Sequence, residues 1–197
     1  NITIINVGKE QLKIQAKIFS QIQQLKINLN IIHSPESFPG KARNIGLSNT
    51  STKIVAFLDS QTRPNFDWLE SGIRLLGTQG YDLVWGRTIF EAESYLEKII
   101  KASTYGNFPL RTVPGTIMRA SITGRVGYFI NDVRAGEDAD WINRVEIHKL
   151  DSGSNPALLV YSGLKGITLY SIIKKWFRNY SAASKLPYIK AHKDVYF

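Results

Sequence analysis

Short aliphatic segments that alternate with amphipathic ones are the feature that most constrains the fold of this chain of 197 residues. Residues 2–7, 27–32 and 54–58 are rich in aliphatic side chains and too short for core helices, so they predict buried strands, the last of them a central parallel strand. Residues 9–25 carry apolar side chains at helical spacing, and a short helix is expected from about Lys41. This order of strand, helix, strand, helix and strand implies right-handed crossovers and a doubly wound α/β sheet.

The second half of the chain continues the alternation of helices and strands. Pro64 and the pair Asp67 and Glu70, which has the spacing of a capping box, predict a helix that runs through Leu76. Further segments with strand or helical periodicity follow: a strand at 82–85, a helix at 91–103, a strand at 113–119 and a helix at 138–150. The sequence has no internal repeat and no obvious linker, so one compact domain with a basic tail is the simplest organisation.

The composition excludes several classes of protein and site. The chain has no cysteine, which rules out disulfides, thiolate zinc sites and a cysteine nucleophile, and its three histidines are far apart in sequence. The longest uninterrupted apolar runs have five residues, whereas a membrane-spanning helix needs about 18 or more. The formal net charge of +9 suggests an anionic partner, which could be a phosphate-rich ligand, nucleic acid or an acidic membrane surface.

Positive charge is concentrated at the C-terminal end of the chain. Residues 161–197 include seven basic residues and one acidic residue. Within this tail, residues 166–180 combine apolar side chains such as Trp176 with basic ones such as Lys174, as an amphipathic basic helix does. Such a helix either packs its apolar face on the domain or lies on an anionic membrane surface, and the sequence leaves both alternatives open.

Two clusters of polar residues lie where ligands bind in open α/β sheets, beyond the carboxyl ends of strands. Asp59 and Gln61 directly follow the expected strand at 54–58, and Glu137 and Asp138 stand at the start of an expected helix. A carboxylate in either place can orient hydroxyl groups, hold a cation or act as a base. In the alternative interpretation, Asp59 is a turn residue and the two later acids only stabilise the helix N-terminus through the helix macrodipole.

The order of these motifs resembles that of the inverting glycosyltransferases of family 2, which have the GT-A fold. The segments that carry the resemblance are PGKARNIGL at 39–47, IVAFLDSQTRPNFDWLE at 54–70, PGTIMR at 114–119, VGYF at 126–129 and GEDADWINR at 136–144. In the family, the corresponding order is an A-R-N-x-G motif, a strand ending in Asp-x-Asp, P-x-x-x-W-L, a glycine-to-arginine segment, V-G-x-F and a Glu-Asp pair. The resemblance implies a doubly wound GT-A fold, an α/β fold with a mixed, mainly parallel sheet and helices on both faces.

The resemblance also suggests how the chain is divided. Residues 1–160 are expected to form a GT-A-like domain, and residues 161–197 a basic amphipathic extension that packs on it or faces a membrane. The chain begins at Asn1 without a methionine, which suggests a fragment. Residues 2–7 match the second strand of the family, so the first strand is expected to be absent; in a competing register they are the first strand.

The resemblance implies a donor site for a nucleotide sugar. Asp59 matches the first acid of the Asp-x-Asp motif, which contacts the donor ribose or a metal ion, and Gln61 stands where the second acid normally binds Mg²⁺ or Mn²⁺. An amide oxygen is a weaker ligand for a hard cation than a carboxylate, so a divalent cation is expected to bind weakly or not at all. Basic residues could neutralise the leaving diphosphate instead, unless they are solvated surface charges. The other expected donor-binding side chains are Lys41, Arg43, Asn44 and Arg63.

The resemblance likewise assigns an acceptor side to the site. Asp138 matches the catalytic base of the family, which removes the proton of the acceptor hydroxyl, and Glu137 beside it is assigned to acceptor binding. Trp141 lies nearly on the same helix face as Asp138, and it is either an apolar platform for an acceptor sugar or one more core aromatic residue. Gly115 either lets the backbone approach the ligand closely or marks a bulge.

Three hypotheses about function follow. The leading one is a glycosyltransferase that moves a sugar from a nucleotide diphosphate donor to a saccharide or lipid-linked acceptor with inversion, in the cytoplasm or at the inner face of the membrane. The second is a degenerate glycosyltransferase that binds a nucleotide or glycan without turnover, because Gln61 replaces an acid and the family's late histidine is missing near residue 161. The third, a nucleic-acid-binding domain, rests only on the net charge, so no nucleic acid is expected as a partner.

Overall fold

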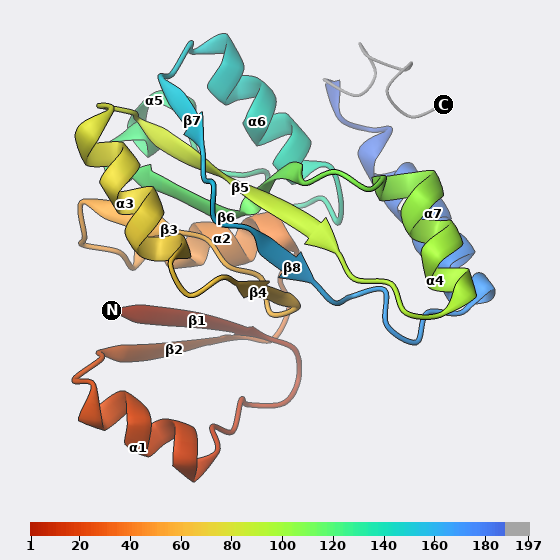
Figure 1. The fold of residues 1–197 in the computed structure, drawn as a ribbon, viewed down its shortest axis with the longest axis horizontal. Coiled ribbons are helices and arrows are strands. Elements are labelled where there is room, and N and C mark those ends of the chain that lie inside the picture. The colour runs from red at the N-terminus through yellow and green to blue at the C-terminus, as the bar shows by residue number, and fades with distance from the viewer. Residues whose placement is uncertain (188–197) are drawn as a thin grey trace.

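The computed structural model describes residues 1–187 and contains two β-sheets surrounded by helices (Figure 1). Strands β1 (Ile2–Val7) and β2 (Leu29–Ser34) pair in parallel, and helix α1 (Ala16–Gln24) connects them. Helix α2 (Pro39–Ser48) lies against β1 and leads into the second, larger sheet.

The second sheet has six strands and is mixed. Its strand order is β3–β6–β5–β8–β4, with β7 also paired to β5. Its strands are β3 (Ile54–Ala56), β4 (Thr62–Pro64), β5 (Leu83–Phe90), β6 (Leu110–Arg119), β7 (Ser152–Ser154) and β8 (Leu159–Tyr161). Strands β7 and β8 are parallel to β5, whereas β6 is inserted antiparallel between β3 and β5, and β4 is antiparallel to β8. Four of the six described strands therefore run in one direction, as the expected α/β fold requires.

Helices cover both faces of this sheet. Successive residues of a strand point to opposite faces, so neighbouring residues of β5 contact different helices. Leu83 of β5 packs in one buried cluster with Trp141 of α6, and its neighbour Val84 packs in a second cluster with Leu76 of α3. No helix within residues 1–187 is long and apolar enough to cross a membrane. Besides α1 and α2, the helices are α3 (Trp68–Thr78), α4 (Tyr95–Ile100), π-helical η1 (Lys101–Tyr105), 3₁₀-helical η2 (Ala120–Ile122), α5 (Thr123–Val126), α6 (Glu137–Ile147) and α7 (Leu169–Ala183).

The strand pairing corrects two expectations. The segment 54–58 was expected to be a central parallel strand, but β3 ends at Ala56 and pairs antiparallel with β6, its one partner among the described strands. In addition, β1 and β2 form a sheet of their own, because within residues 1–187 no ladder joins β1 to β3. Local periodicity indicates that a segment is a strand, but the partner of that strand is decided by long-range contacts.

Several helix ends also differ from the expected ones. Helix α1 begins at Ala16, and residues 9–15 are not helical. Asp67 is the N-cap residue of α3, but its side chain makes no capping hydrogen bond, so the expected pairing with Glu70 does not form. Helix α4 starts later than expected because Ser94 and Glu97 form a capping box, in which each side chain bonds the other's backbone N–H.

Helix α7 packs on the domain with one side and exposes the other. Ile172 is fully buried in a cluster with Ile100, whereas the side chains of Trp176 and Phe177 are 40% and 74% exposed. The tail therefore packs on the domain without burying all of its apolar residues. The expected domain boundary at residue 160 stays a prediction, and residues 188–197 of the expected extension lie outside the described residues.

Glu97 joins α4 to the loop that precedes α7. Its carboxylate accepts hydrogen bonds from the backbone N–H groups of Glu93 (2.7 Å), Ser94 (3.2 Å) and Gly166 (2.9 Å). These bonds stabilise the charged form and lower the pKa of Glu97 to about 2. The position of α7 on the domain therefore depends partly on this one carboxylate.

Replacing Glu97 with Gln is expected to lower the melting temperature at neutral pH, because an amide cannot accept all three N–H bonds. Since the pKa of Glu97 in the folded protein lies below its ordinary value of 4.5, the stability that the carboxylate provides is complete above pH 4.5 and is lost as the pH falls towards 2. Melting temperatures of the two proteins should therefore converge over that range. Glu93→Gln removes an exposed ion pair with Lys165 (3.7 Å) and serves as a control with little effect. A Glu97→Gln difference that is the same at every pH contradicts this account.

Candidate active site

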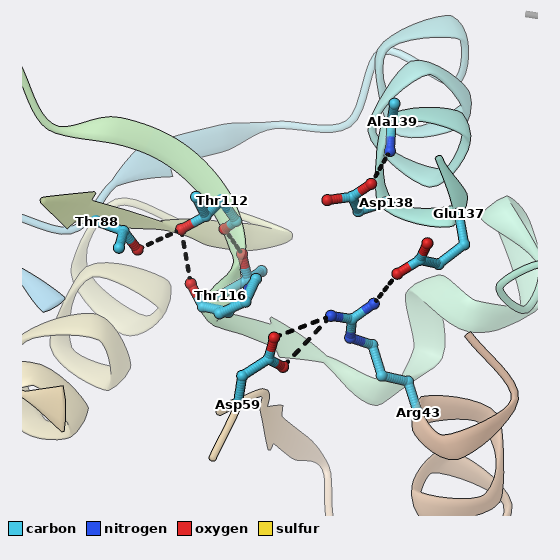
Figure 2. A network of polar contacts seen from close by, with 9 residues as sticks. Arg43, Asp59, Thr88, Thr112, Thr116, Glu137, Asp138 and Ala139 are labelled. Atoms are coloured by element: carbon cyan, nitrogen blue, oxygen red, sulfur yellow. Dashed lines mark hydrogen bonds and ion pairs between the residues drawn. The ribbon is translucent and has the colours of Figure 1, made fainter. Parts of the chain in front are cut away.

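Arg43 connects three segments that are far apart in the sequence (Figure 2). From α2, its Nη1 donates a hydrogen bond to Glu137 Oε1 (2.9 Å) at the start of α6, and its Nη2 donates to Asp59 Oδ1 (3.3 Å) after β3. The side chains of Arg43 and Glu137 are only 11% and 6% exposed, whereas that of Asp59 is 44% exposed. We call this set of three residues the Arg43 bridge. It leaves Asp59 accessible to a ligand while the other two members are enclosed.

The charges in the Arg43 bridge shift the pKa values of its enclosed members. Burial lowers the pKa of Arg43, but the negative charges of Asp59, Glu137 and Asp138 outweigh it and raise the pKa overall. Burial and the neighbouring charge of Asp138 raise the pKa of Glu137, although Arg43 opposes the shift. Asp138 therefore lies close enough to both groups to affect their ionisation.

Asp138 lies in the first turn of α6, next to Glu137 (Figure 2). It is half-buried, and its Oδ1 accepts a hydrogen bond from the backbone N–H of Ala139 (2.9 Å). The N-cap residue of α6 is Gly136, so neither acid caps the helix with its side chain, although both favour its N-terminus electrostatically. The second carboxylate oxygen of Asp138 has no hydrogen-bond donor among the described residues.

Asn44 lies beside the Arg43 bridge but is engaged elsewhere. Its Oδ1 accepts from the backbone N–H of Phe129 (2.9 Å), and its Nδ2 donates to the carbonyl of Phe129 (2.7 Å) and to Asn131 Oδ1 (2.8 Å). The guanidinium group of Arg43 lies 5.4 Å from the centre of the Phe129 ring. Asn44 thus fixes the loop on which Arg43 rests, and its expected donor contact stays a prediction.

Two residues expected on the acceptor side are part of the core. Trp141 is 1% exposed, its ring stacks on Phe129 with the ring centres 4.9 Å apart, and its Nε1 donates to the carbonyl of Gly127 (3.3 Å). Gly115 has φ +84°, and a Cβ atom there would collide with Leu159. Core packing therefore explains both residues, and an acceptor platform at Trp141 is incorrect because no ligand can reach its ring.

The two other expected cations do not reach the Arg43 bridge. The side chain of Arg63 is 75% exposed, and its Nη2 donates to Glu91 Oε1 (3.0 Å). Lys41 is exposed in the first turn of α2 and makes no ion pair within residues 1–187. Of the three cations expected near the leaving group, only Arg43 lies against the carboxylates.

Gln61 is oriented by a residue that the sequence analysis did not identify. Its Oε1 accepts a hydrogen bond from the hydroxyl group of Tyr161 (3.0 Å), which ends β8. Burial and the charge of Asp59 raise the pKa of that hydroxyl group. Tyr161 is a polar residue at the end of a strand, which is a detectable signal, but the antiparallel pairing of β8 with β4 that brings it to Gln61 is not visible in the sequence.

The threonines opposite the Arg43 bridge bond to one another (Figure 2). The hydroxyl groups of Thr88 and Thr112 are 2.7 Å apart, that of Thr112 donates to the carbonyl of Pro114 (2.9 Å), and that of Thr116 donates to the carbonyl of Thr112 (2.8 Å). The pairing of β5 and β6 shifts register here, between Val84 and Gly86. The threonines therefore stabilise a bulge in the sheet beside the site, which the sequence analysis also missed.

The residues at Asp59 do not fit a divalent cation well. A guanidinium group already pairs with the Asp59 carboxylate, and the only oxygen of the Gln61 amide accepts from Tyr161. Among the described residues there is no group of three or more His, Cys, Asp or Glu side chains placed to hold a metal ion. The expected weak role for Mg²⁺ or Mn²⁺ stays a prediction, and no chemical step below depends on a metal.

Comparisons with known proteins identify the family and the fold of the chain. The model of the family "Glycosyl transferase family 2" matches residues 14–129. Glycosyltransferase AglE of Haloferax volcanii is 32% identical over 113 residues, which are 52% of this chain and 37% of AglE. The pre-mycofactocin glycosyltransferase of Mycobacterium tuberculosis is 29% identical over 132 residues, which are 57% of this chain and 27% of that protein. The crystal structure of S. aureus TarS 1–349 with UDP-GlcNAc is 14% identical with a TM-score of 0.57, and the match covers 98% of this chain and 60% of TarS. The chain thus spans less than two fifths of these curated relatives, and the family match ends before Glu137.

Replacing Arg43 with Met is expected to lower the free energy of unfolding by about 3–5 kcal/mol at neutral pH, because it leaves the buried charge of Glu137 without a partner. Since the pKa of Glu137 is already raised above its ordinary value of 4.5, this carboxylate protonates early as the pH falls, and the loss should be smaller at pH 4.5 than at pH 7. Urea unfolding at both pH values measures the difference. The double variant Arg43→Met/Glu137→Gln should regain part of the loss at pH 7; if it does not, Glu137 is not the cause.

Proposed function

The chain belongs to glycosyl transferase family 2 and is a glycosyltransferase, and from this premise we propose that it moves a sugar from a nucleoside diphosphate donor to a saccharide or lipid-linked acceptor with inversion. The observation that carries the proposal is the Arg43 bridge with Asp138 beside it. It places one accessible carboxylate after β3 and a second carboxylate at the start of α6 on the same side of the domain.

Asp59 is the proposed contact for the donor. Its carboxylate is 44% exposed and is oriented by Arg43, so a hydroxyl group of the donor could donate to its free lone pairs. The crystal structure of TarS with UDP-GlcNAc supports a nucleotide sugar as the donor class, because TarS shares the fold of this chain. Arg43 itself is enclosed by two carboxylates and acts mainly as a positioning residue.

Asp138 is the proposed general base. The oxygen of the acceptor hydroxyl attacks the anomeric carbon from the side opposite the leaving group, the bond from that carbon to the diphosphate oxygen breaks, and the hydroxyl proton passes to the Asp138 carboxylate. The nucleoside diphosphate leaves with the bonding electron pair, so the configuration at the carbon inverts. Glu137 stays paired with Arg43 and acts as a positioning residue for the turn that carries Asp138.

A second candidate function is a nucleotide- or glycan-binding module without turnover. The observation that favours it is Gln61, an amide that accepts from Tyr161 where the family has a second acid. The two candidates differ in whether any donor supports transfer by the unmodified protein.

We also propose that the protein works at the cytoplasmic face of a membrane, where α7 would contact the lipid surface. Phe177 and Trp176 of α7 are 74% and 40% exposed, and the same helix carries three basic residues. Exposed aromatic residues beside lysines suit an anionic lipid surface, on which a lipid-linked acceptor would lie.

Replacing Asp138 with Asn is expected to reduce turnover by about 10²–10⁴-fold, because general-base catalysis contributes that much. Donor affinity and melting temperature should hardly change, since an Asn oxygen can still accept from the N–H of Ala139. Asp140→Asn is the matched control: it removes a carboxylate of the same turn that pairs with Arg144 (2.8 Å), and should reduce stability more than turnover. Full activity of the Asp138→Asn protein would refute the assignment, and an inactive parent with every donor would favour the binding module.

Replacing Trp176 and Phe177 with Ala is expected to weaken binding to phosphatidylglycerol vesicles by about tenfold or more, because burying one such side chain contributes about 1.5–3 kcal/mol. Phe177 is 74% exposed, so its loss should change the melting temperature little, whereas the loss of Trp176, which is 40% exposed, should lower it moderately. Phe66→Ala is the control, because Phe66 is fully exposed and lies outside α7. Vesicle cosedimentation measures the effect, and equal binding by all three proteins would contradict a membrane contact through α7.

A further inference from the structure

A surface cavity of about 500 Å³ lies between α7 and the segment that follows β8. Gln61, Tyr161 and Gly163 line one side, and Lys174, Lys175 and Arg178 of α7 line the other. We call it the α7 cavity. Because Gln61 is two residues from Asp59, the cavity adjoins the Arg43 bridge, and the charge of Asp59 contributes to the raised pKa of Tyr161 in its wall.

The α7 cavity has uncompensated positive charge. Its lining includes three cations and no carboxylate, and none of these cations forms an ion pair with any other residue of the described range 1–187. Lys174 and Arg178 are four residues apart on one helix, a spacing at which like charges repel each other. Burial and the charge of Arg178 lower the pKa of Lys175. An anion in the cavity would offset the repulsion between these cations and favour the charged form of Lys175.

Gln61 adds hydrogen-bond donors to the same wall. Its only oxygen accepts from Tyr161, so its Nε2 group, which has no bond among the described residues, is left to donate to a ligand. Gly163 makes room for this pair, because a Cβ atom there would collide with the Tyr161 hydroxyl group and with Gln61 Oε1. A carboxylate at position 61 would repel an anion, whereas the amide can bind one.

We propose that the α7 cavity is a phosphate-binding subsite, in which α7 supplies the positive charge and Gln61 an amide donor. The ligand is a phosphate or diphosphate group, which belongs either to the leaving diphosphate of the donor or to a phosphorylated acceptor. With a donor ligand the inference rests on the proposed function; binding of inorganic pyrophosphate does not. In this subsite, α7 supplies the positive charge that was expected from Lys41 and Arg63, which lie elsewhere.

Calorimetry of the full chain with inorganic pyrophosphate, in EDTA, tests the subsite without a nucleoside or a metal. The double variant Lys174→Gln/Arg178→Gln should lose affinity by at least about tenfold, because two charge-assisted hydrogen bonds are removed. Its melting temperature without ligand should be equal or higher, since a repulsion is also removed. Lys185→Gln is the matched control: it removes an exposed charge near the end of α7 that does not line the cavity, and affinity should be unchanged.

Gln61→Asp is an independent variant, because it changes the other wall of the cavity. It should weaken pyrophosphate binding in EDTA, and added Mn²⁺ should restore binding to this variant more than to the parent. The subsite is overturned if the parent does not bind pyrophosphate, or if the Lys174→Gln/Arg178→Gln variant binds as tightly as Lys185→Gln does.

Competition with UDP identifies the source of the phosphate. If saturating UDP prevents pyrophosphate binding, the subsite holds the donor diphosphate; if pyrophosphate binds equally well to the UDP-saturated protein, the subsite serves a phosphorylated acceptor. The result also separates the two proposals. Pyrophosphate binding that depends on α7, without any binding of UDP or another nucleoside diphosphate, supports the subsite and contradicts the proposed donor class. UDP binding that the α7 variants do not affect supports the proposed donor class and contradicts the subsite.

Discussion

The ion pairs of Arg43 are the interaction on which the site depends. A nearly enclosed guanidinium group pairs with Glu137, also enclosed, and with Asp59, which is partly open to solvent. Each enclosed charge is tolerable only because the other is present, since a lone buried charge costs several kcal/mol. The same pairing joins α2, the end of β3 and the start of α6. The need to pair the enclosed charges of Arg43 and Glu137 thus brings the segments that carry Asp59 and Asp138 together.

An aromatic cluster supports Arg43. Phe129 lies close to the guanidinium group and stacks on Trp141, while Asn44 bonds both polar groups of the Phe129 backbone. Arg144 donates to the carbonyls of Val126 and Tyr128 in the same loop. Arg43 and Asn44 belong to the motif that the family resemblance associates with donor binding. Both side chains are therefore partly used to hold neighbouring parts of the site in place.

Charge is divided between two neighbouring regions of the protein. The Arg43 bridge and Asp138 contribute three carboxylates and one guanidinium group, whereas the α7 cavity beside them presents cations without described carboxylate partners. A nucleotide sugar and its acceptor combine neutral hydroxyl groups, which carboxylates can bind or deprotonate, with phosphate groups, which need cations. Gln61 stands between the two regions, and the amide in place of an acid is compatible with both.

The sequence by itself determined the type of most elements and the α/β class, because periodicity records which face is buried. Its motifs, which lie next to strand and helix ends, singled out Arg43, Asp59 and Glu137 as site candidates but did not show that they pair. It did not determine that β3 pairs antiparallel with β6, that Trp141 is enclosed, or that Arg63 pairs with Glu91. It also gave no sign that α7 brings its cations to Gln61. These outcomes depend on strand order and helix docking, which arise from contacts between residues distant in sequence, and only the tertiary structure decides which charge lies beside which.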